Sequence, residues 1–176
     1  MTGIGDDTQI GQDGERQINA ALLSYCRGID RLDGAAVLAA FHPGAMLLDY
    51  GPEPTTIEAF TERILPSLEE RFTATQHRIS NTAITVDQRG ALVETYVLAY
   101  HVEAGEPAEP GGDGADRLYT FNGRYIDRFE SRDGRWRIAT RALRCDWSRI
   151  ETIDATMGGT WVASGRAGTA DPLDDL

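Results

Sequence analysis

Asp30 and His77 are the two side chains whose types and surroundings suit acid–base chemistry. Near the end of the first expected helix, apolar residues recur at three- and four-residue spacing, at Ile18, Leu22, Tyr25, Ile29 and Leu32. They make one stripe that faces a core. Asp30 lies at the border of this stripe, where a buried carboxylate is costly unless it is paired. An imidazole can take and return a proton because its unperturbed pKa of about 6.5 is close to neutrality.

The sequence therefore predicts that Asp30 and His77 meet in a pocket as an acid–base pair. A carboxylate bonded to the ring would fix its tautomer and stabilise the imidazolium. The alternative is that Asp30 caps or salt-bridges its helix end and that His77 is structural.

Three more side chains are candidate site residues with a structural alternative. Tyr25 belongs to the apolar stripe, so its hydroxyl either enters a pocket as a catalytic donor or is hydrogen bonded in the core. His101 is a candidate substrate-binding residue on a long expected strand, or a histidine at the sheet rim. Asp49 ends a short apolar strand, where it either reaches the pocket or faces solvent.

An arginine of the last expected strand would pair with Asp30 or bind an anionic or carbonyl group. Residues alternate between the two faces of a strand. Arg144 shares its parity with Ile138, on the expected inner face, whereas Arg141 shares its parity with Arg137. Arg144 is therefore predicted to face the pocket, unless a bulge reverses the alternation.

The composition limits the possible partners. The chain has 176 residues, enough for one domain with its own core, and a net charge of -11, which argues against nucleic acid and anionic membranes. Cys26 and Cys145 have no metal-like spacing, and reduced thiols in a cytoplasmic protein are expected. There is no phosphate-binding glycine loop, zinc-type cluster or signal-peptide run. A small molecule is the expected ligand, with no metal and no cofactor.

Helical periodicity comes first in the chain and strand-like segments follow. Residues 1–14 are predicted to be a disordered leader, 15–150 the domain and 151–176 a C-terminal tail. Three helices are expected, over 15–32, over 35–41 and from the cap Thr56 to about residue 68, with a strand over 45–50 before the third. Long strands are expected over 73–86, 91–102, 118–131 and 135–147, the first interrupted near Ser80.

This order predicts an α+β fold in which three N-terminal helices pack on a strongly curved, mainly antiparallel sheet. Long strands twist and curl, so the sheet and helices form a cone-shaped barrel around one pocket. An outer strand face carrying Val93, Val97 and Ala99, or their alternating partners, would leave apolar surface exposed. A homo-oligomer is therefore expected.

Three segments resemble the SnoaL-like proteins of the nuclear transport factor 2-like superfamily. Residues 25–33, YCRGIDRLD, resemble their Y-x-x-x-x-D-x-x-D helix end, and residues 76–81, QHRISN, resemble their Q-H-x-x-x-N strand. Residues 133–138, DGRWRI, followed by Arg141 and Trp147, resemble their final hairpin. The resemblance spans roughly residues 15–150 and implies the same cone-shaped fold.

The subgroup that these motifs resemble most includes scytalone dehydratase, bile acid 7α-dehydratase and hexachlorocyclohexane dehydrochlorinase. Those enzymes use a catalytic Asp–His pair, and the resemblance implies that Asp30 and His77 are the matching pair here. It also implies that Tyr25 is a functional tyrosine and His101 a second pocket histidine. It implies a cofactor-independent lyase acting on a small or polycyclic apolar hydroxy-carbonyl compound, and favours a trimer over a dimer. The alternatives are an isomerase or polyketide cyclase with the same pocket, or a non-catalytic module that binds ligands or resembles a dioxygenase small subunit.

Overall fold

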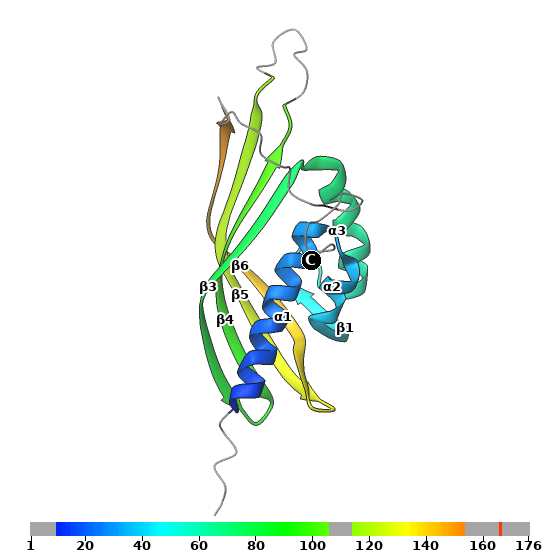
Figure 1. Ribbon diagram of the computed structural model, residues 1–176, viewed down its shortest axis with the longest axis vertical. Coiled ribbons are helices and arrows are strands. Elements are labelled where there is room, and N and C mark those ends of the chain that lie inside the picture. Colours follow the sequence, from blue (N-terminus) through cyan, green and yellow to red (C-terminus); the bar gives the residue numbers. More distant parts are fainter. Residues whose placement is uncertain (1–9, 106–113, 154–165, 167–176) are drawn as a thin grey trace, which may run out of the picture.

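The computed structural model describes residues 10–105, 114–153 and 166. In chain order the elements are α1 (Gln12–Arg31), α2 (Gly34–Ala39), β1 (Phe41–Leu48), β2 (Thr55–Thr56), α3 (Ile57–Arg71), β3 (Ala74–Asp87), β4 (Gly90–Glu103), β5 (Asp116–Arg132) and β6 (Arg135–Ile153). The strands form one six-stranded sheet of order β2-β1-β6-β5-β4-β3. Only the β1–β6 pair is parallel among these neighbours. Figure 1 shows the long strands curving past α1 and α3, which lie on one side of the sheet.

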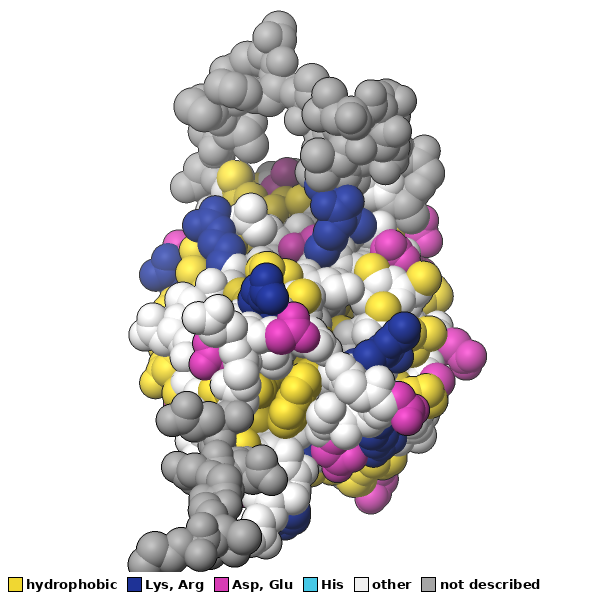
Figure 2. Space-filling view, turned by 60° about the horizontal axis from the view of Figure 1, so that its bottom comes forward, with side chains coloured by type: hydrophobic (Ala, Val, Ile, Leu, Met, Phe, Trp, Pro, Cys, Tyr) yellow, Lys and Arg dark blue, Asp and Glu magenta, His cyan; other side chains and the backbone are white. Residues whose placement is uncertain are grey.

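The predicted fold class is confirmed: helices pack on a strongly curved, mainly antiparallel and unclosed sheet. Strands of 14 to 19 residues accumulate enough twist to bend the sheet around the helices. None of the described helices is long and apolar enough to cross a membrane. On the face that Figure 2 shows, basic and acidic side chains are interspersed and form no continuous basic patch.

Side-chain hydrogen bonds support the first turns of α1 and α3. Helix α1 starts at Gln12, so the predicted leader is wrong for residues 12–14, and residues 1–9 lie outside the described part. The Asp13 carboxylate accepts hydrogen bonds from Arg16 and Gln17 and places negative charge at the helix N-terminus. The predicted cap of α3 is present, because Ala59 N–H donates to the Thr56 hydroxyl over 3.3 Å.

Three irregularities set which side chains face the helices. The predicted interruption of β3 is a bulge at Asn81, where the register shifts between Ser80 and Thr82. In β6 one bulge falls at Ala139, because Ile138 pairs with Phe129 and Thr140 with Arg128, and a second falls between Cys145 and Trp147. The strand continues to Ile153, so the predicted tail is wrong for residues 151–153, and apart from Arg166 the remaining tail lies outside the described residues.

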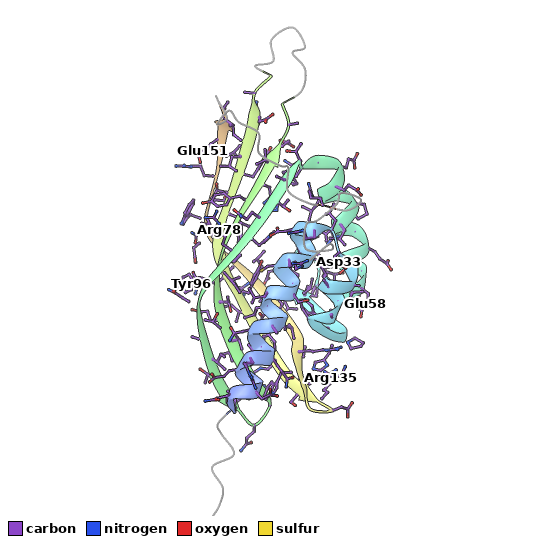
Figure 3. The ribbon with its side chains drawn as sticks, viewed as in Figure 1. Asp33, Glu58, Arg78, Tyr96, Arg135 and Glu151 are labelled. Atoms are coloured by element: carbon purple, nitrogen blue, oxygen red, sulfur yellow. The ribbon has the colours of Figure 1, made fainter. Side chains whose placement is uncertain are left out.

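The core lies between the apolar stripe of α1 and the concave face of the sheet. Val93, Val97 and Ala99 are at most 3% exposed and belong to this inner face, so the second of the two expected alternatives holds. Their alternating partners face outward, as Leu92 at 42% exposure and Tyr96 at 40% show. Figure 3 shows Tyr96 pointing away from the helices. Trp147 on β6 is half exposed and adds to this outer apolar surface, through which copies of the chain would associate. The homo-oligomer stays a prediction.

Candidate functional site

Asp30 and His77 are in direct contact at the point where the end of α1 meets β3. One Asp30 carboxylate oxygen lies 2.7 Å from His77 Nδ1, and the other accepts the backbone N–H of His77 over 2.8 Å. The side chains are 19% and 10% exposed, respectively. An ionised carboxylate only accepts hydrogen bonds, so the proton of a neutral His77 is on Nδ1 and its Nε2 is the basic atom. The contact has the geometry of an acid–base pair.

His101 is the second histidine of this group. Its ring stands edge-on to the His77 ring, with centroids 5.4 Å apart. Burial, followed by the nearby His77 charge, lowers the pKa of His101 to about 4. His101 also lines a pocket of about 520 Å³ together with Tyr119, Phe121, Ser148 and Ile150. A neutral imidazole is therefore available there at neutral pH to bind a polar group of a ligand.

This low pKa predicts a pH dependence of stability. In the unfolded chain His101 takes up a proton near its ordinary pKa of 6.5, whereas in the folded protein it takes up that proton only near pH 4. The unfolded state therefore holds more protons, and the free energy of unfolding should fall as the pH drops from about 6.5 to about 4. Urea denaturation of the wild type and of His101→Gln at pH 7.5 and pH 5 measures this effect. The variant should lose less stability than the wild type, and an equal loss would contradict the assignment.

The ring of Phe72, the first residue after α3, packs beside the ring of His101. Its ring centroid lies 5.0 Å from that of His101 and 5.7 Å from that of Tyr119. Arg166 donates hydrogen bonds to the backbone oxygens of Phe72 and Leu68, which are carbonyls at the C-terminus of α3. Sequence reasoning missed Arg166, because no local pattern links it to a helix almost a hundred residues earlier.

Arg141 and Asp127 form a fully buried ion pair below the α1 stripe. Arg141 Nε and Nη2 each donate to one Asp127 oxygen over 2.7 Å, and both side chains are 0% exposed. The guanidinium also stacks on the rings of Tyr25 and Tyr125, with centroid distances of 4.3 and 3.9 Å. Arg141 Nη1 and the Tyr50 hydroxyl are buried and have no hydrogen-bond partner among the described residues. These two polar groups could bind a ligand oxygen or water.

The prediction that Arg144 faces the pocket is wrong. The bulge at Ala139 reverses the alternation, so Arg141 faces the helices and Arg144 lies opposite Arg124 on the convex face. There Arg144 forms an ion pair with Asp49, in which each side chain is 53% exposed. Asp49 therefore joins Arg144 at the surface, and neither residue belongs to the group around His77.

Tyr25 lies in the core at 3% exposure, packed edge-on against Phe41 and Tyr125. Burial raises its pKa, with the Arg141 charge acting in the opposite direction, so the hydroxyl is neutral. Its expected catalytic role stays a prediction. The scattered histidines also include His42, whose Nε2 contacts the Glu130 carbonyl over 2.9 Å. The described residues contain no cluster of three or more His, Cys, Asp or Glu suited to a metal ion.

These features define a class of protein: a cone of helices and curved sheet that carries an Asp–His pair on its concave side. A model of the SnoaL-like domain matches residues 13–142. The chain therefore belongs to the SnoaL-like family of the nuclear transport factor 2-like superfamily. A search of curated proteins finds no match.

Solved structures share the fold at low sequence identity. A protein of Kribbella flavida is 21% identical with a TM-score of 0.66, covering 80% of this chain and 95% of its own. A proposed scytalone dehydratase of Novosphingobium aromaticivorans is 23% identical with a TM-score of 0.61, over 89% and 95%. The hexachlorocyclohexane dehydrochlorinase of Novosphingobium barchaimii is 13% identical with a TM-score of 0.61, over 84% and 95%. Identities this low show a common fold.

Proposed function

We propose that this protein is a cofactor-independent lyase that eliminates water from a small or polycyclic apolar hydroxy-carbonyl compound. The observation that carries the proposal is the 2.7 Å contact between His77 Nδ1 and Asp30, with the pocket of His101 beside it. The family includes structural neighbours named as dehydratase and dehydrochlorinase, which supports elimination chemistry.

His77 serves as base and then as acid in this proposal. Nε2 takes the proton from the carbon next to the carbonyl, and the electron pair of the C–H bond moves into the enolate. The imidazolium then returns the proton to the departing hydroxyl, so water leaves and a carbon–carbon double bond forms. Asp30 stabilises the imidazolium between these steps. Such proton transfers contribute about 10²–10⁴-fold to the rate.

The remaining stabilisation must act on the enolate oxygen. Arg141 Nη1 and the Tyr50 hydroxyl are buried donors without a partner among the described residues, and a donor held in a dry environment strongly stabilises developing charge. We assign the substrate oxygen, directly or through water, to these groups and to Tyr25, which stacks on Arg141. Neutral His101 would bind the hydroxyl group of the substrate.

A panel of β-hydroxy ketones, from monocyclic to steroid-like, tests the proposal. Each compound is incubated with the protein in D₂O, and proton NMR follows both water loss and deuterium exchange at the carbon next to the carbonyl. We expect enone formation, with exchange, for at least one compound. If every compound is unchanged and unexchanged, the lyase proposal fails.

The same experiment separates the alternative functions. An isomerase or polyketide cyclase would exchange deuterium and rearrange or cyclise its substrate without losing water. A ligand-binding module would shift the resonances of a bound compound without exchange or conversion. The paired Asp30 and His77 favour proton transfer over simple binding, since a passive pocket gains nothing from an oriented base.

A further inference from the structure

Tyr119 lines two pockets at the open end of the cone. The pocket of about 520 Å³ contains His101, Phe121 and the exposed side chain of Ile150, and it is called the inner pocket because His101 lies against His77. The outer pocket, of about 870 Å³, is bordered by charged residues, among them Glu70, Arg71, Glu103 and Arg117. In the β4–β5 pairing Tyr119 lies opposite His101. Its ring therefore borders both an apolar space beside His101 and a second space lined by charged side chains.

The position of the Tyr119 ring is fixed by two neighbours. Its hydroxyl donates to one carboxylate oxygen of Glu103 over 2.5 Å, and Arg71 Nε donates to the other over 2.7 Å. The Arg71 guanidinium also lies 4.9 Å from the ring centroids of both Tyr119 and Phe72. Figure 1 shows α3, which ends at Arg71, reaching the same end of the cone at which β4 ends and β5 begins.

These contacts hold the ring firmly without making it part of the core. The Tyr119 hydrogen bond, followed by that of Arg71, lowers the pKa of Glu103, so the carboxylate stays ionised and accepts both bonds at neutral pH. The Arg71 and Glu103 side chains are 50% and 27% exposed, and such ion pairs contribute little to global stability. Substitutions here should change the pockets while leaving the fold intact.

We propose that Tyr119 is a specificity-determining residue: its ring separates the two pockets and restricts the inner one to compact ligands, and Glu103 and Arg71 hold the ring in place. A ligand with a long apolar body would need the space that the ring fills. This inference deepens the proposed function by assigning a size class to its substrate, and it rests on that function only in taking the pocket of His101 as the substrate site.

The test compares two fluorescent probes of one chemistry and different length, 1-anilinonaphthalene-8-sulfonate and its dimer bis-ANS. In Tyr119→Ala the dissociation constant for bis-ANS should fall about tenfold, and that for the short probe by less than about threefold, because the vacated ring space buries the second unit. Tyr119→Phe keeps the ring and loses the bond to Glu103, so an intermediate effect is expected. Tyr96→Ala, on the convex face, is the matched control and should match the wild type.

Chemical protection shows whether the probe occupies the inner pocket. Trypsin places His42, His77 and His101 on separate peptides, because arginines flank each of them. Bound bis-ANS should slow diethyl pyrocarbonate modification of His101 in Tyr119→Ala and leave His42 unaffected. Circular dichroism and thermal melting verify that each variant is folded.

Three results would overturn the inference: an unchanged bis-ANS affinity in Tyr119→Ala, an equal gain in Tyr96→Ala, or a gain without protection of His101. Failure of either probe to bind any of the proteins would also count against it. Neither probe is turned over, so the outcome is independent of elimination chemistry. If the protein shows the size effect but converts no hydroxy ketone, the proposed role of Tyr119 stands and the proposed lyase function fails.

Discussion

His77→Ala is expected to abolish conversion of any hydroxy-carbonyl substrate that the wild type accepts, while the protein stays folded. The substitution removes the proposed base, and general acid–base catalysis is worth about 10²–10⁴-fold. The fold should survive, because the backbone N–H of residue 77 still donates to the Asp30 carboxylate. Steady-state kinetics and urea denaturation measure the two effects separately.

Asp30→Asn should lower the turnover rate nearly as much, because it keeps the side-chain shape and removes the charge that stabilises the imidazolium. Binding of the substrate should change less than turnover. The two losses should be strongly non-additive in the double variant, since residues that act as one unit fail together.

Asp33→Asn provides a matched control three residues along the chain. Asp33 accepts from Ala36 N–H at the start of α2, and asparagine caps helices as well as aspartate does. The control should retain wild-type turnover. Unchanged activity in His77→Ala on a substrate that the wild type converts would remove the proposed mechanism.

The fold and the Asp30–His77 contact could be predicted because their signals are local and regular. The apolar stripe of the first helix places Asp30 at the border of a core. Long segments in which apolar and polar residues alternate, followed by tight turns, define the hairpins. His77 precedes the bulge of its strand at Asn81, so simple alternation holds up to that point. The resemblance to SnoaL-like proteins then linked two segments that residue patterns alone do not connect.

The arginine of the core could not be predicted because a bulge changes parity without a clear sequence signal. Ala139 is an ordinary strand residue, yet the extra residue there turns Arg141 inward and Arg144 outward. Tyr50 and Arg166 were missed for a related reason. The tertiary fold brings Tyr50, which follows a strand, close to Tyr25 and Arg141. It likewise brings Arg166, from beyond the last strand, to the end of α3.

The buried pair gives the second large expected effect, on stability. Arg141→Met should lower the free energy of unfolding by about 3–5 kcal/mol, because it leaves the Asp127 carboxylate buried without its counter-ion. Urea denaturation at pH 7 measures the loss. Arg144→Met removes the same residue type from the same strand, where the pair with Asp49 is half exposed, and should cost only about 0–1 kcal/mol.

A double variant separates stability from chemistry at this site. Arg141→Met combined with Asp127→Leu removes both charges, so much of the lost stability should return. Turnover should not return with it, because Arg141 Nη1 is the proposed donor to the substrate oxygen. Recovery of both properties would show that Arg141 serves the fold alone, and equal destabilisation by Arg141→Met and Arg144→Met would contradict the assignment of a buried pair.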